Sequence, residues 1–147
     1  MEPWICHEAG HLTTALHLGF GVSSLKVIGG KPTTMCELDA EERTNEERYL
    51  FLAGGIAGEK HHLGRYDKDA CADDQAKISA LSGGPIESYL PGALDIVVAH
   101  KKLFDELKKK IKIKMLERQM VGMVVGASNT FEILSEVEIG QVWHLHK

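Results

Sequence analysis

Apolar side chains recur near the start of the chain at the spacing of one helix face. The stripe consists of Trp4, Ile5, Leu12, Ala15 and Leu16. A period of about 3.6 residues is typical of an amphipathic helix. Pro3 favours a first helical turn because its φ is fixed and it has no N–H that needs a partner, and Gly19 offers a stop. We therefore expect a helix from Pro3 to the residue before Gly19.

The pattern then changes to that of extended strands. Residues 22–28 are enriched in β-branched side chains and partly alternate between polar and apolar positions. A Gly-Gly-Lys-Pro turn at 29–32 separates them from a second extended run at 33–38. Two such runs joined by a short glycine-containing turn are typical of a β-hairpin.

Helical spacing returns in four later segments, which are residues 45–62, 73–81, 93–120 and 135–144. Asn45 is a favourable N-cap for the first of these, and Ser135 with Glu138 forms a capping-box pattern at the last. The segment 93–120 fits either one long helix or two. Several helices with one hairpin predict an α+β fold that is predominantly α-helical, and 147 residues suit a single domain, 1–147.

Charge narrows the classes of partner. Residues 1–99 carry 8 basic and 15 acidic side chains, net −7, and residues 100–147 carry 9 and 6, net +3. This mild asymmetry does not indicate nucleic-acid binding. The lysines of 108–114 form a basic face, for which a solvated surface over a packed apolar stripe is favoured over membrane contact.

Cysteine content and apolar run length bear on location. Cys6, Cys36 and Cys71 are odd in number and scattered, which is typical of reduced thiols in a cytoplasmic protein. No apolar run approaches about 18 residues, so we expect no transmembrane segment. We also expect no removable leader, because the N-terminus lacks a basic region and a chemically distinctive motif already begins at His7.

That motif is His-Glu-Ala-Gly-His at residues 7–11. On a helix, His7 and His11 lie at i and i+4 on one face and can bind one metal ion. Glu8 follows His7 directly, close enough to address a water on such an ion. Bound zinc lowers the pKa of water to about 7, so a nearby carboxylate can take its proton as general base. The pattern predicts a zinc metallopeptidase that cuts peptide bonds with zinc-activated water. The alternative is an amphipathic helix with two solvated histidines.

A catalytic zinc ion usually has about three protein ligands and a water, so one ligand is missing from the motif. Asp73 and Asp74 are the candidates, and each has an alternative role as the N-cap of the third helix. His61 and His62 lie at a helix end, where solvated side chains are the favoured interpretation. Gly10 inside the first helix predicts a place that needs a small residue, and the pair at 54–55 predicts close contact between helices.

Three segments in order resemble the peptidase domain of the FtsH-type ATP-dependent zinc proteases. The first is the His-Glu-Ala-Gly-His motif, the second is Leu52–Glu59, similar to L-x-G-G-x-A-A-E, and the third is 70–79. The third resembles the family segment that holds the last zinc ligand, and the resemblance puts Asp74 on that ligand. Ala70 replaces a family glycine, which leaves Asp73 as the alternative. Residues 130–139 resemble the closing helix pair of the family.

The resemblance implies a zincin-like metallopeptidase domain with Zn2+ held by His7, His11 and Asp74, and with Glu8 as catalytic base. It also implies a protein or peptide substrate, a possible homo-oligomer and, since the ATPase module is absent from this sequence, a possible separate ATPase partner. An edge strand beside the metal often binds an extended peptide in metallopeptidases. Two rivals stay open, which are a catalytically inactive metal-binding regulatory module and a different zinc hydrolase that cuts one repressor.

Overall fold

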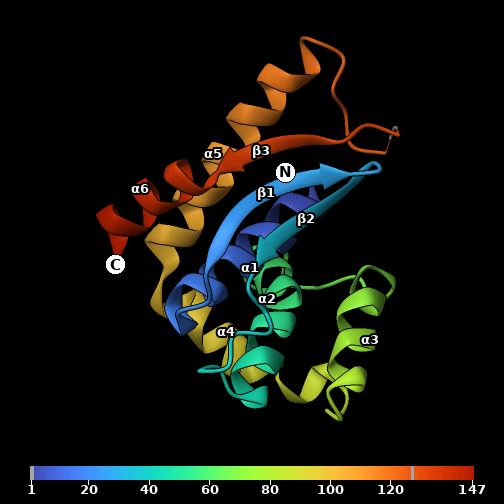
Figure 1. The fold of residues 1–147 in the computed structure, drawn as a ribbon, viewed down its shortest axis with the longest axis vertical. Coiled ribbons are helices and arrows are strands. Elements are labelled where there is room, and N and C mark those ends of the chain that lie inside the picture. The colour runs from blue at the N-terminus through green and yellow to red at the C-terminus, as the bar shows by residue number, and fades with distance from the viewer. Residues whose placement is uncertain (1, 127) are drawn as a thin grey trace.

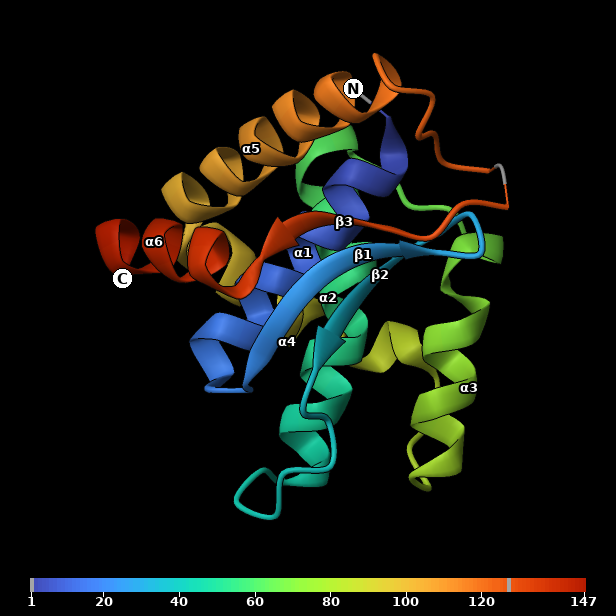
Figure 2. The ribbon, with the colours of Figure 1, turned by 45° about the horizontal axis from the view of Figure 1, so that its top comes forward.

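The computed structural model describes residues 2–126 and 128–147 as an α+β fold that is mostly helical (Figure 1). Its elements are α1 (Pro3–Leu18), β1 (Val22–Ile28), β2 (Lys31–Cys36), α2 (Asn45–Leu63), α3 (Ala72–Ala80), α4 (Leu90–Ala99), α5 (Lys101–Gln119), β3 (Phe131–Ser135) and α6 (Glu136–His146). The strands form one antiparallel sheet in the order β2-β1-β3. Helices α1 and α2 lie behind this sheet in the view of Figure 2.

Helices α1 and α2 are in close contact because glycines remove side chains from their interface. A Cβ atom on Gly10 would overlap the carbonyl oxygen of Gly54, and one on Gly58 would overlap the carbonyl oxygen of Cys6. The two backbones therefore touch where any larger residue would separate them. The predicted need for a small residue at position 10 and for a helix contact at Gly54 is confirmed.

The predicted hairpin is confirmed, although its second strand begins at Lys31 rather than at residue 33. Gly29 and Gly30 both have positive φ, 56° and 84°, and Ile28 pairs directly with Lys31. A two-residue turn with φ above zero at both positions matches the twist of the flanking strands, which is why glycine serves there. In this sheet β1 is central and β2 is an edge strand.

The resemblance to a closing helix pair over residues 130–139 is wrong in its first half. Residues Phe131–Ser135 form β3, in which Phe131 and Ile133 are buried and Glu132 between them is exposed. This alternation suits a strand, and β3 completes the sheet by pairing with β1. The predicted capping box is confirmed at the start of α6, where Ser135 and Glu138 exchange both hydrogen bonds.

Two helix starts differ from expectation. Of the two alternatives for the segment 93–120, the structure has two helices, α4 and α5, which meet at His100, and α4 begins at Leu90 rather than at residue 93. Asn45 is not the N-cap of α2. Thr44 takes that position, because its hydroxyl accepts a hydrogen bond from the Glu47 N–H while the Glu47 carboxylate accepts one from the Thr44 N–H. This reciprocal pair satisfies two amide groups that the start of a helix leaves without partners.

The core lies between the sheet, α1, α2 and α5. Its largest fully buried side chains come from all of these elements and include Leu12, Leu25, Leu52, Ile56, Phe104, Leu107 and Ile133. Cys6, Cys36 and Cys71 are free thiols, as expected. Among the described residues, no helix combines the length and the apolar character that crossing a membrane requires.

Candidate metal centre

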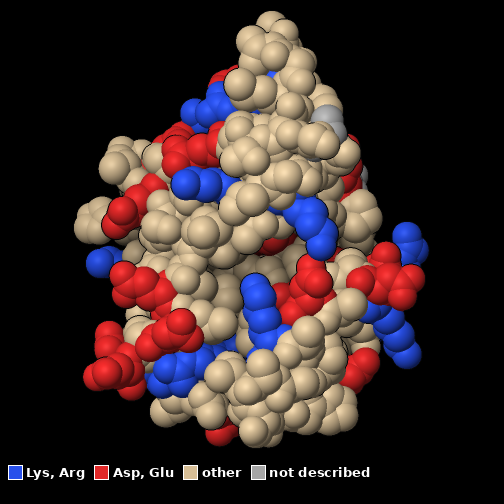
Figure 3. All heavy atoms as spheres, turned by 45° about the vertical axis from the view of Figure 1, so that its right-hand side comes forward, with Lys and Arg blue, Asp and Glu red and all other residues tan. Residues whose placement is uncertain are grey.

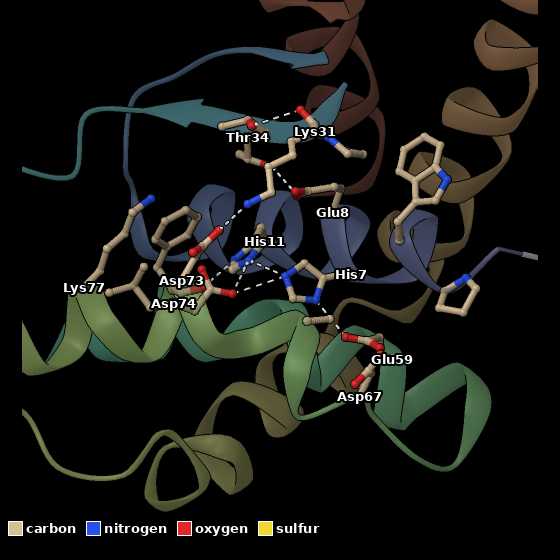
Figure 4. Close-up of a pocket in the computed structure, with 17 residues that line it drawn as sticks. His7, Glu8, His11, Lys31, Thr34, Glu59, Asp67, Asp73, Asp74 and Lys77 are labelled. Atoms are coloured by element: carbon tan, nitrogen blue, oxygen red, sulfur yellow. Dashed lines mark hydrogen bonds and ion pairs between the residues drawn. The ribbon is translucent and has the colours of Figure 1, made fainter. Parts of the chain in front are cut away.

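Helix α1 directs both histidines of the motif to one point in the molecule (Figure 4). The Nε2 atoms of His7 and His11 lie 3.1 Å apart, as the i, i+4 spacing predicts. Glu8 projects toward β2, where its carboxylate accepts a hydrogen bond of 3.4 Å from the Thr34 hydroxyl. Both His11 and Glu8 are buried, each with 5% of its surface exposed. The motif thus lines an interior site and is not a solvated helix face.

The third acidic group at this point comes from α3. Asp74 Oδ2 lies 3.2 Å from Nε2 of His7 and 3.2 Å from Nε2 of His11. Asp73 points away and forms an ion pair of 2.9 Å with Lys31, with both side chains 76% exposed. The structure therefore groups Asp74, and not Asp73, with the two histidines. Neither aspartate is an N-cap, because α3 begins at Ala72 after a 3-10 turn at Asp69–Cys71.

Each histidine is held through its other ring nitrogen. Nδ1 of His7 donates to the Glu59 carboxylate at 2.7 Å, and Nδ1 of His11 donates to the Phe51 carbonyl oxygen at 2.9 Å. With the proton on Nδ1, a neutral imidazole presents a lone pair at Nε2. Carboxylates and carbonyls behind ligand histidines set this tautomer in many metal sites. Sequence reasoning assigned no role to Glu59 or Phe51, although Glu59 ends a motif quoted above.

The three converging atoms suit a cation. Two imidazole lone pairs and a carboxylate oxygen face one another at 3.1–3.2 Å, and such acceptors repel unless a positive charge lies between them. Bonds of about 2.0–2.1 Å in a tetrahedral zinc site separate ligand atoms by about 3.3–3.4 Å, which is close to this spacing. His7, His11 and Asp74 therefore can hold a metal ion.

Electrostatics at the site agree with that arrangement. Burial lowers the pKa of His7, but hydrogen bonds with Asp74 and Glu59 raise it to about 10. Burial raises the pKa of Asp74, yet the charge of His11 and the bonds with both histidines hold this pKa well below its usual range. Without a metal, a proton on His7 supplies the positive charge that these acceptors need. Burial also raises the pKa of Glu8, against the opposing charges of His11 and His7.

The site opens into a cavity of about 420 Å³ between α1, β2 and α3. Its lining includes the three grouped residues, Glu8, the β2 residues 31–34 and the apolar side chains of Trp4, Phe51 and Leu52. Figure 3 shows a hollow on this face with basic and acidic side chains around it. This cavity therefore connects Glu8 and the grouped residues with solvent.

Other candidate ligands do not join the group. His62 Nδ1 lies 2.9 Å from Lys108 Nζ, and the His61 ring packs edge-to-face against Phe104 with centroids 5.5 Å apart. Within the described residues, no cysteine belongs to a possible metal-binding cluster. His61 and His62 therefore lie outside the group of His7, His11 and Asp74.

Gly55 of α2 makes room for the two imidazoles. A Cβ atom there would overlap the His7 ring and approach His11 Nε2 to 2.7 Å. We expect Gly55→Ala to weaken metal binding by about 10- to 100-fold, because displaced imidazole rings can no longer direct both Nε2 atoms at one ion. Gly140→Ala is the matched control, since a Cβ on Gly140 of α6 meets nothing within 4 Å. Competition with a chromogenic chelator measures both affinities, and equal affinities would contradict this role for Gly55.

No protein-family model, curated protein or solved structure gave a significant match to this chain. The resemblance to FtsH-type peptidase domains therefore remains a prediction from the sequence motifs.

Proposed function

We propose that this protein is a zincin-like zinc metallopeptidase that hydrolyses peptide bonds in proteins or peptides. The observation that carries the proposal is the convergence of His7 Nε2, His11 Nε2 and Asp74 Oδ2 within 3.2 Å of one another, beside the buried carboxylate of Glu8. Two imidazoles and one carboxylate are a ligand set typical of catalytic zinc, whereas calcium and magnesium favour oxygen ligands alone.

The residues of the site divide the chemistry among them. When bound, zinc supplies Lewis-acid activation of water and of the scissile carbonyl. Glu8 accepts the proton of the attacking water and delivers it to the leaving amine. Its raised pKa suits this shuttle, because a carboxylate that is reluctant to stay charged takes up a proton more readily. Thr34 holds the Glu8 carboxylate toward the cavity through its hydroxyl.

Substrate binding is proposed along β2. This strand is at the edge of the sheet, and its residues Pro32, Thr33 and Thr34 line the cavity beside Glu8. An extended peptide can add to such an edge through main-chain hydrogen bonds, which accept many side chains. Pro32 has no N–H, so pairing would rely on the residues that follow it.

The test begins with metal-free protein titrated with Zn2+ and then assayed on casein and a peptide library. We expect one zinc ion per chain and hydrolysis that a chelator abolishes and added zinc restores. Stoichiometric binding without hydrolysis would instead indicate the inactive metal-binding module. Cleavage confined to a single sequence would favour a dedicated regulatory protease. Absence of stoichiometric metal binding would overturn the proposal altogether.

A further inference from the structure

Helix α5 holds a concentration of positive charge that the rest of the chain lacks. Residues 101–119 contain 8 of the 17 basic side chains and 3 of the 21 acidic ones, net +5. The remainder therefore carries 9 basic and 18 acidic side chains, net −9. A single helix that opposes the sign of the whole molecule creates a local field for an anionic partner.

The same helix ends in an exposed apolar tip. Its side chains are Ile113, Leu116, Met120 and Val121, which are 56%, 54%, 87% and 69% exposed. No charged residue occurs between Arg118 and Glu132 in the sequence. The end of α5 and the segment after it project from the body of the protein in Figure 1, and the projection at the top of Figure 3 is mostly uncharged. Exposed apolar groups clustered in this way mark an interaction site.

The tip is distinct from the stripe with which α5 packs on the core. The buried stripe consists of Leu103, Leu107, Ile111 and Met115, so the packed face expected from the sequence is confirmed. A second stripe of α5 side chains is exposed to solvent. It runs through Lys109, Ile113, Leu116 and Met120 at helical spacing i, i+4, i+7 and i+11.

Along this second stripe the exposed lysines lie toward the start of α5 and the apolar residues toward its end, where the Glu117 side chain is also 54% exposed. Lys109 and Lys112 are exposed and form no ion pair among the described residues, unlike Lys114, which pairs with Glu138 at 2.9 Å. At a rise of about 1.5 Å per residue, Lys112 and Lys109 lie about 12 Å and about 16.5 Å behind Met120. An interfacial segment is buried by about 5–10 Å. With Met120 inserted to that depth, both lysines therefore lie outside the apolar layer, on the side of the lipid phosphates.

We propose that the end of α5, with its apolar tip (Ile113, Leu116, Met120 and Val121) and basic collar (Lys109 and Lys112), docks on a membrane surface rich in anionic lipid. This inference is independent of the metal centre. A second copy of the chain fits less well, because tip-to-tip pairing would bring two helices of net charge +5 together. A purely electrostatic partner would not need apolar side chains that are more than half exposed.

The experiment is flotation of the purified full chain with vesicles. We expect binding to vesicles of phosphatidylcholine with phosphatidylglycerol, and none to phosphatidylcholine alone. Lys109→Glu with Lys112→Glu should weaken partitioning by about 30-fold or more, since each lysine at an anionic surface contributes about fivefold. Met120→Ser with Val121→Ser should weaken it by about tenfold.

Two matched pairs serve as controls. Lys101→Glu with Lys102→Glu makes the same charge change at the other end of α5, and Val137→Ser with Leu145→Ser removes apolar side chains that are 68% and 78% exposed on α6. Both should bind as the parent chain does. The proposal is overturned by absence of binding to anionic vesicles, by equal loss in the controls, or by binding that the Met120/Val121 pair leaves unchanged. It is also overturned if lipid-free protein self-associates through Met120.

Discussion

Replacement of Glu8 by Gln is expected to reduce kcat/KM for peptide hydrolysis by about 10³-fold, while zinc still binds at one ion per chain. A positioned general base contributes about 10²–10⁴ in rate, and the amide of Gln cannot accept the proton of water at neutral pH. The substitution keeps the size of the side chain and its position opposite Thr34. Glu8 itself is not one of the grouped ligand residues, so metal affinity should change little.

The measurement pairs hydrolysis of a fluorogenic peptide with zinc content on the same sample. Glu42→Gln is a suitable control, because Glu42 is exposed in the loop before α2 and its replacement removes the same charge. We expect its activity to equal that of the parent chain. If Glu8→Gln retains full activity with zinc bound, Glu8 is not the base and the mechanism proposed above is wrong.

Replacement of Asp74 by Ala is expected to weaken zinc binding by about 10³-fold or more and to abolish hydrolysis. It removes one of three ligand atoms, and the two remaining imidazoles lose the carboxylate that lies 3.2 Å from both. The neighbouring variant, Asp73→Ala, removes the same charge one residue away. Because Asp73 is 76% exposed and paired with Lys31, we expect its zinc affinity to stay within about threefold of the parent value.

This pair of variants separates ligation from general electrostatics, since both lose one negative charge beside the same cavity. Chelator competition gives the two affinities, and thermal unfolding of the metal-free proteins shows whether either variant fails to fold. Removal of Asp74 also leaves His7 without one hydrogen-bond partner. The metal-free Asp74→Ala variant should therefore unfold at a lower temperature than the parent chain. Loss of zinc in Asp73→Ala with retention in Asp74→Ala would transfer the ligand role to Asp73.

Local features of the chain were the most predictable from sequence. The helix that bears His7 and His11, the hairpin turn at Gly29 and Gly30 and the capping box at Ser135 each depend on residues within about four positions of one another. The N-cap of α2 was misplaced by one residue, because Thr44 and Asn45 are both favourable caps and only the partner, Glu47, distinguishes them.

Features that depend on distant residues were missed or left open. Residues Phe131–Ser135 form a strand because β1 offers a free edge to pair with, about 100 residues earlier in the chain. The alternation of this segment stops at Leu134, which is buried like Ile133 beside it, so periodicity alone does not distinguish a strand from a helix here. Glu59 lies 52 positions from the His7 that it holds, and no spacing rule connects them.

The pair of imidazoles at His7 and His11 and the carboxylate of Glu8 beside them follow from the sequence alone. The i, i+4 geometry of one helix requires nothing else. Which of Asp73 and Asp74 lies beside the two histidines is visible only in the folded chain. Adjacent residues on α3 point about 100° apart, so the approach of α3 to α1 directs one aspartate inward, to both histidines, and the other outward, to Lys31.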